Sequence, residues 1–325
     1  MTGHSQDINF SQFYELPLLR NPGLAGIFSG DFRLTSSYRN QWQSVTVPYR
    51  TMALGAEYIL PQSEDAVSTK VLGLIVTNDI AGDSKFSRTQ VFPALNLQMP
   101  LNFGNQTFLS LGFMGGPVLQ KFDPTKLTFD DQFVNGTYSP SNPTSQVFNK
   151  TNVTYFDIAT GISISGYLGE QSQYYLGGAG FHLVQPKVAF MEQNNIVLNR
   201  KFVINAGVYA PTGIDSRFTI YADYFAQGSY HQAQGGFMFT RDIGGDGEEN
   251  TTTRITGGAF YRWNDAIIPV IKFDVNNLGI GLSYDVNTST LKTASQYRGG
   301  FELTLTYKNQ LSSRHPDATA CPVTF

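Results

Sequence analysis

The sequence predicts an all-β protein, a single transmembrane antiparallel β-barrel of about 14 strands with an N-terminal periplasmic segment. Two runs carry this prediction most directly, Asn277–Val286 and Tyr297–Lys308, in which apolar and polar residues alternate. Successive strand side chains point to opposite faces, so each run has one apolar and one polar face. The second run has aromatic residues at both ends of its apolar face, as lipid-facing strands have at the two membrane interfaces. Taken alone, these runs fit a half-exposed strand of a soluble β-sandwich equally well.

The composition also favours a barrel. Charged residues make up only 14% of the 325 residues, whereas the chain has 25 Phe, 17 Tyr and 32 Gly. A barrel that presents aromatic girdles to lipid has this composition, although a large secreted β-protein shares it. The formal net charge is −3 and no basic tract occurs, so nothing indicates a nucleic-acid partner. The sequence contains no apolar run of the roughly eighteen residues that a transmembrane helix needs, and a barrel has no such run.

Strand patterns follow one another from Asp31 onward, and helical signals are nearly absent. Ser11–Leu19 has room for one or two helical turns, which Pro17 interrupts. Many strand candidates have about ten residues, which at about 3.3 Å per residue and about 45° tilt cross roughly 25 Å, the height of the apolar band. Their number is even, as single-chain bacterial barrels require. The predicted strands are Asp31–Trp42, Tyr49–Leu60, Lys70–Asn78, Gln90–Leu101, Gln106–Pro117, Val153–Ser165, Gln173–His182, Phe202–Ala210, Arg217–Ala226, Tyr230–Thr240, Thr253–Arg262, Ile267–Phe273, Asn277–Val286 and Tyr297–Lys308.

The lengths of the connections predict which end of the barrel faces which compartment. If the N-terminus lies in the periplasm, the two longest connections, Val118–Asn152 and Leu183–Lys201, are external, and the short Asn102–Asn105 is periplasmic. Long external loops and short periplasmic turns are the rule for such barrels. Two connections depart from it, because Pro61–Thr69 and Arg241–Thr252 are long for periplasmic turns.

We expect three parts in the chain: an N-terminal periplasmic or plug segment (1–30), the barrel (31–308) and a C-terminal tail (309–325). Asn21-Pro22-Gly23, with the glycines that follow it, is turn chemistry. Phe10, Phe13, Tyr14 and Leu16 are apolar enough to need burial. A barrel of this size is near the width that leaves an open lumen. We therefore expect residues 6–26 to fold into or against the periplasmic mouth and narrow it.

No residue pattern predicts a catalytic, cofactor or metal site. The four histidines are scattered without metal-ligand spacing, and the single cysteine, Cys321, excludes a disulfide within the chain. There is neither a phosphate loop nor a dinucleotide fingerprint. Asp242–Glu249 clusters carboxylates and glycines but lacks calcium-loop spacing, so a solvated acidic turn is the better interpretation.

Candidates for partner binding come from the polar face of the strands, from the N-terminal aromatics and from one loop. Arg33, Arg39, Arg298, Glu302 and Lys308 are predicted to face the lumen, either as a charged wall that pairs internally or as a surface that holds a plug or a client. The loop Leu183–Lys201 contains apolar residues that either form an interface or pack over the barrel mouth, namely Val188, Phe190, Met191, Ile196, Val197 and Leu198. The selected candidates are Phe10, Phe13, Tyr14, Phe190, Met191, Ile196, Arg39, Arg298 and Glu302.

Both ends of the chain carry short motifs in a fixed order. The N-terminal motifs are Gln6–Tyr14, Leu16–Leu18, Asn21–Gly26, Tyr38–Trp42 and Pro48–Tyr49, and the C-terminal ones are Tyr261–Pro269, Gly281–Asn287, Gly299–Leu303 and Cys321–Phe325. Together they resemble the PorP/SprF family of the type IX secretion system in Bacteroidota. The resemblance extends from Gln6 to Phe325, with a less diagnostic middle. Mature chains of that family begin near the Gln-Asp motif, so the resemblance implies that a signal peptide is removed.

The resemblance implies an outer-membrane β-barrel without enzymatic activity. It further implies a role in the secretion and cell-surface attachment of a partner protein, such as a gliding-motility adhesin with a type B C-terminal secretion domain. The implied partners are this secreted protein, other secretion or gliding components and outer-membrane lipid. The alternatives are an outer-membrane channel for small solutes and a soluble lectin-like β-protein.

Overall fold

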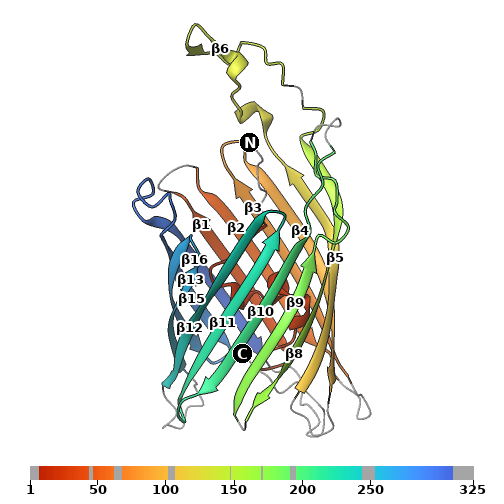
Figure 1. Ribbon diagram of the computed structural model, residues 1–325, viewed down its shortest axis with the longest axis vertical. Helices are drawn as coiled ribbons and strands as arrows, with labels where there is room; N and C mark the ends of the chain where they lie inside the picture. Colours follow the sequence, from red (N-terminus) through yellow and green to blue (C-terminus); the bar gives the residue numbers. More distant parts are fainter. Residues whose placement is uncertain are drawn as a thin grey trace.

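A closed antiparallel barrel dominates the computed structural model, which describes residues 7–43, 47–61, 68–101, 107–146, 148–169, 171–190, 195–243 and 253–309 (Figure 1). Within these residues, neighbouring strands pair in chain order, and the first strand pairs with the last to close the barrel. The barrel strands are β1 (Phe32–Gln41), β2 (Tyr49–Ile59), β3 (Thr69–Ala81), β4 (Phe86–Pro100), β5 (Thr107–Lys121), β8 (Asn152–Leu168), β9 (Ser172–Phe181), β10 (Lys201–Pro211), β11 (Ser216–Gln227), β12 (Tyr230–Ile243), β13 (Thr253–Arg262), β14 (Ala266–Val275), β15 (Leu278–Asn287) and β16 (Arg298–Asn309).

The predicted all-β barrel of fourteen strands is confirmed, and the differences lie at strand ends. β4 begins at Phe86 rather than Gln90, and β5 continues to Lys121 rather than Pro117. The added residues still pair, as Ser87 does with Lys121. Segments such as Ser87–Gln90 carry few apolar side chains, so the alternation that marks a lipid-facing strand is missing there although the hydrogen-bonded ladder continues.

The barrel wall has a polar inner face and an apolar outer face. On β16, Glu302, Thr304 and Thr306 are buried toward the lumen, whereas Leu305 and Tyr307 on the opposite face are exposed. The same alternation runs through the other strands, with Leu, Ile, Val and Phe on the outside. A barrel needs a polar inner face and an apolar outer face when its outer wall contacts the hydrocarbon of a membrane. Among the described residues, no helix has the length and apolar character needed to cross a bilayer.

The two ends of the barrel differ in their connections. One end, here called the long-loop end, carries residues 122–151, 182–200 and 288–297 between its strands. The other, the turn end, carries short connections such as 212–215 and 276–277. Residues 244–252 and 62–67, which include most of the two long turns noted in the sequence, lie outside the described residues, as does the tail beyond Asn309.

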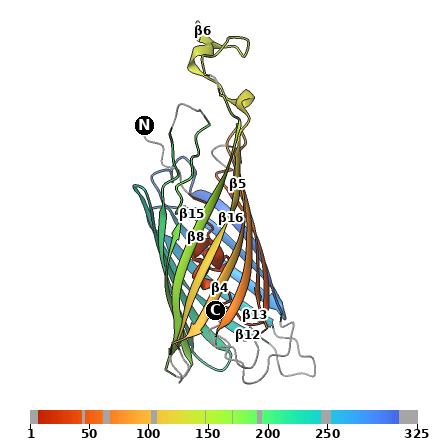
Figure 2. The same ribbon diagram turned by 90° about the vertical axis from the view of Figure 1, so that its right-hand side faces the viewer.

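A small β-hairpin projects from the long-loop end. It consists of β6 (Phe133–Val134) and β7 (Thr137–Tyr138), and it follows the short helices η3 (Pro124–Lys126) and η4 (Asp130–Gln132). The Asn135-Gly136 turn has positive φ at both residues, the geometry that two-residue hairpins prefer. Figures 1 and 2 show this hairpin standing well away from the barrel rim.

The N-terminal segment lies inside the barrel (Figure 2). It forms η1 (Phe13–Glu15), α1 (Pro17–Arg20) and η2 (Pro22–Leu24). Pro17 separates η1 from α1 and is the first residue of α1, where its missing N–H costs nothing. Asp7 contacts residues of the long-loop end, and Gly30 adjoins Asn309 at the turn end. The segment therefore runs through the lumen from end to end. The sequence had led us to expect it only in or against the periplasmic mouth.

Candidate functional site

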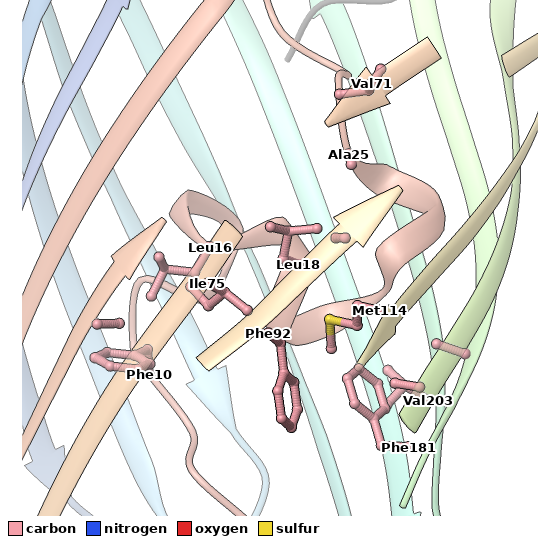
Figure 3. Packing of buried hydrophobic residues seen from close by; sticks show 14 of the residues in the cluster. Phe10, Leu16, Leu18, Ala25, Val71, Ile75, Phe92, Met114, Phe181 and Val203 are labelled. Carbon is pink, nitrogen blue, oxygen red and sulfur yellow. The ribbon is translucent and has the colours of Figure 1, made fainter. Parts of the chain in front are cut away.

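The candidate functional site combines the segment in the lumen with the surface of the long-loop end. Residues 7–30 are here called the plug. Its apolar side chains pack on inward-facing apolar residues of β3, β4 and β5 (Figure 3). Leu16 and Leu18 are buried in one cluster with Ile75 and Phe92 of the wall, and Phe10 belongs to the same cluster. The plug and this part of the wall thus share one apolar core.

An aromatic stack fixes the plug on the opposite wall. Tyr14 stacks on Tyr221 of β11 and Phe260 of β13, with ring centroids 5.2 Å apart in both pairs. Phe13 meets Phe260 edge-on at 5.4 Å. Such pairs contribute about 0.5–1.5 kcal/mol each beyond the burial of their area. The predicted burial of Phe10, Phe13 and Tyr14 is therefore met inside the chain.

Arg20 joins the plug to the wall through a bidentate buried ion pair. Its Nε and Nη2 donate to the two carboxylate oxygens of Asp223 at 2.8 and 2.6 Å, and Nη2 also donates to the Tyr175 hydroxyl at 2.7 Å. Both members of the ion pair are almost completely buried. A bidentate pair of this kind fixes position as well as charge, because the planar guanidinium matches the carboxylate.

Glu15 ties the plug to the wall nearer the turn end. Lys272 of β14 donates to its carboxylate at 2.5 Å, and the Thr306 hydroxyl donates to the other oxygen at 2.9 Å. Burial alone raises the pKa of a carboxyl group, but Lys272, Lys308 and the hydrogen bonds outweigh it and lower the pKa of Glu15 to about 2. Glu15 is therefore ionised at any physiological pH, and this contact does not titrate there.

Glu302 binds the backbone of the plug. Its two oxygens accept hydrogen bonds from the N–H groups of Ser11 and Gln12 at 2.7 and 2.9 Å. The side chain is 1% exposed, and it lies beside Arg39, which bonds to Asp285 at 2.6 Å and also to the Asn9 carbonyl. Two predicted lumen residues, Arg39 and Glu302, are thus brought together around the plug, as a charged wall that pairs with it.

The first described residue of the plug is held at the long-loop end. The Asp7 carboxylate contacts Arg88 of β4, lies 3.1 Å from Lys201 of β10, and is 3.6 Å from His182. His182 also bonds to Asp157 at 2.5 Å. Burial raises the pKa of Asp7, but Lys201, Arg88 and His182 together hold it well below its usual value. The plug is therefore anchored by charge at both ends.

Glycines of the wall make room for the plug backbone. Gly112 of β5 and Gly161 of β8 face each other in the ladder, and both lie under the Asn21-Pro22-Gly23 turn. A Cβ atom on Gly112 would overlap the Pro22 carbonyl, and one on Gly161 would overlap the Asn21 side chain. The turn is therefore seated directly on the wall.

Replacing Gly161 with alanine is expected to weaken the docking of the plug. An added methyl group in a packed site costs about 1–3 kcal/mol, so amide hydrogen exchange in plug peptides should accelerate roughly tenfold to hundredfold. Gly257→Ala is the matched control, since a Cβ there meets nothing within 4 Å. Equal exchange in the two variants would show that the seat is not tight.

The loops of the long-loop end are joined by a cluster of phenylalanines. Phe122 meets Phe148 at 5.0 Å and Phe190 at 4.8 Å between ring centroids, and Phe190 also meets Phe86 at 6.1 Å. On the loop that carries Phe190, the side chain of Leu198 is buried, whereas that of Ile196 is 55% exposed. The apolar residues of this loop thus divide between packing and exposure. The cluster gives the β6–β7 hairpin an ordered base.

The hairpin tip presents apolar side chains to solvent. Phe133 and Val134 are 51% and 53% exposed, and Tyr138 packs against Phe133 at 5.5 Å while remaining exposed. The hairpin that carries them stands well away from the barrel rim (Figure 1), so the lipid around the barrel does not account for their exposure. Exposed apolar groups gathered in this way mark interaction surfaces.

Two of the predicted residues do not join these groups. Arg298 was expected to face the lumen with Glu302, and this is wrong: the pairing of β15 with β16 shifts register between Asp285 and Val286, and Arg298 is exposed at the long-loop end. Met191 lies outside the described residues. Arg33 and Lys308 do face the lumen. Among the described residues, no group of three metal-binding side chains lies together.

Sequence reasoning missed Arg20 and Asp223 as plug contacts, because 203 positions separate them and neither stands in a motif. The wall glycines carried a usable signal. Gly112, Gly161 and Gly177 stand at inward positions of three strands that are neighbours in the barrel. Glycine at such positions indicates that another backbone approaches the wall closely, as a plug does.

Comparisons with known proteins agree with this architecture. The family model described as "Type IX secretion system membrane protein PorP/SprF" matches residues 2–307. No curated protein sequence matches the chain. The toluene transporter TbuX of Ralstonia pickettii is similar in structure, with a TM-score of 0.51 at 8% identity over 91% of this chain and 93% of that one. The CymD monoaromatic hydrocarbon channel gives a TM-score of 0.47 at 8% identity over 92% and 93%. At these identities the likeness is one of fold.

Proposed function

Because this chain belongs to the PorP/SprF family of type IX secretion system membrane proteins, and is thus an outer-membrane β-barrel, we propose that it holds a secreted partner protein at its long-loop end. The partner is a surface protein with a type B C-terminal secretion domain, such as a gliding adhesin. The barrel supports its secretion and its attachment to the cell surface together with other components of the system, and it has no enzymatic role. In this proposal the long-loop end is external, as the long connections favour.

The filled lumen is the observation that carries the proposal. The plug occupies the barrel from Asp7 at one end to Gly30 at the other and is held by apolar packing, buried ion pairs and a glycine seat. A lumen filled in this way does not favour free diffusion of solutes, which is the alternative function. The surfaces left for partner binding are then the two ends of the barrel and its outer wall.

The β6–β7 hairpin is the best-supported contact for the partner. It is raised above the rim, its base is fixed by the phenylalanine cluster, and its tip exposes Phe133, Val134 and Tyr138. Rigid, exposed aromatic anchors are the residues that most often dominate protein–protein binding. Ile196 adds an exposed apolar side chain on the neighbouring loop. The assignment of Phe10, Phe13 and Tyr14 to partner binding stays a prediction, since their present contacts are with the wall.

Replacing Phe133, Val134 and Tyr138 together with serine should reduce surface display of the partner about tenfold or more, because loss of buried aromatic anchors commonly costs 2 kcal/mol or more. Display is measured with antibody on intact cells, for the secreted surface protein whose display depends on this chain. The matched control is Ile214→Ser, an equally apolar and fully exposed residue at the turn end. Normal display with the triple variant at wild-type barrel levels would refute the hairpin as the contact.

A further inference from the structure

A polar cavity of about 430 Å³ opens at the turn end, on the side of the plug away from its glycine seat. Tyr14, Glu15 and Ser29 of the plug line it from within, and strands β10 to β14, β16 and β1 contribute to its wall. We call it the turn-end cavity. It lies at the opposite end of the barrel from the hairpin, so the proposed partner site does not account for it.

The lining of this cavity is cationic and rich in hydroxyl groups. Five cationic side chains face it, Arg33, Arg217, Arg254, Lys272 and Lys308, whereas Glu15 and Asp274 are the carboxylates among its lining residues. Arg33 is engaged by Glu57 at 2.6 Å, and Lys272 by Glu15 at 2.5 Å. These two pairs are complete and hold the plug and the wall.

The two arginines nearest the mouth have donors to spare. Asp242 Oδ1 lies 3.0 Å from Arg217 Nη1 and 3.4 Å from Arg254 Nε, so one carboxylate serves two guanidinium groups. Among the described residues, no other carboxylate pairs with Arg217 or Arg254. Each guanidinium offers five N–H donors, of which a shared carboxylate satisfies only part.

We propose that the turn-end cavity binds the carboxylate side chains of a short acidic peptide segment that enters from the turn end. Arginine forks match carboxylates in a bidentate manner, and Arg217 and Arg254 lie close enough together to share one carboxylate, that of Asp242. The cavity volume lies in the range of ligand pockets, about 300–1,000 Å³, and a single small anion would leave most of it empty. The binding is independent of the proposed client function, because it uses the other end of the barrel.

The test uses the purified full chain in detergent and two fluorescein-labelled pentapeptides, Gly-Asp-Glu-Asp-Gly and its amide counterpart Gly-Asn-Gln-Asn-Gly. Fluorescence anisotropy should show binding of the acidic peptide only, weakening as salt is raised. The double variant Arg217→Gln/Arg254→Gln should bind it at least about tenfold more weakly, since charge-assisted hydrogen bonds are lost.

Arg241→Gln is the matched control, because Arg241 lies on β12 next to Asp242 but on the outer face, and its loss should leave binding unchanged. Equal binding of both peptides, or an unaltered affinity in the double arginine variant, would overturn the proposal. Complete displacement of the acidic peptide by low millimolar inorganic phosphate would assign the cavity to a free oxyanion and overturn the peptide as ligand.

Discussion

Replacing Arg20 with leucine is expected to raise the population of molecules with a released plug far more than any other single substitution in the lumen. The substitution leaves the Asp223 carboxylate buried without its partner and removes the donor to Tyr175. Breaking a buried pair by deleting one member costs about 3–5 kcal/mol. Phe10, Phe13 and Tyr14 would then be open to chymotrypsin, and cleavage in the plug should accelerate by about a hundredfold to a thousandfold.

The double variant Arg20→Leu/Asp223→Leu separates the uncompensated charge from the loss of packing. With both charged groups replaced by apolar ones, no carboxylate remains stranded, and most of the protection should return, because such replacements are often close to neutral. Cleavage rates follow the population of the open form when opening and closing are fast. Wild-type cleavage in Arg20→Leu would mean that the ion pair does not hold the plug.

The strands were predictable because lipid imposes a simple rule on them. Every residue of β15 and β16 that meets hydrocarbon is apolar and its neighbours are not, so the alternation can be read from single residues. The rule fails where lipid ends. At Arg298 the alternation continues in the sequence, but the irregular pairing after Asp285 exposes the side chain at the rim.

The path of the plug was not predictable for a different reason. The need to bury Phe13 and Tyr14 is visible in the sequence, but the surface that buries them is assembled from β11 and β13, more than 200 residues away. Ion pairs such as Glu15 with Lys272 leave no local mark either. The turn-forming residues Asn21-Pro22-Gly23 are compatible with a segment at the barrel mouth and with a segment inside the lumen. The inward-facing glycines of the wall distinguish these two positions, but they are informative only once it is known which strands are neighbours.

Deleting residues 7–19 is expected to turn a closed barrel into a conducting pore. The deletion removes Asp7, Ser11 and Glu15 with their contacts to Lys201, Glu302 and Lys272, and it removes the aromatic stack on Tyr221. Residues 20–30 stay on the wall, but a barrel of this strand number is near the width of an aqueous channel once residues 7–19 no longer fill the rest of the lumen. Planar bilayers should therefore show stable conductance steps with the deletion variant and none with the full chain.

The comparison also decides between the two functions considered for this chain. Heat-dependent mobility on gels identifies preparations in which the deletion variant is still folded, and the hairpin triple variant at Phe133, Val134 and Tyr138 serves as a control with an intact plug. Conductance in the full chain would favour the solute channel, and an unchanged record after deletion would contradict a plug that closes the lumen.

Surface display in the deletion strain then tests Phe10, Phe13 and Tyr14. If display persists while the pore conducts, the plug only closes the barrel, and the client depends on the loops alone. If display is lost although the barrel is folded, those side chains act on the partner as well as on the wall.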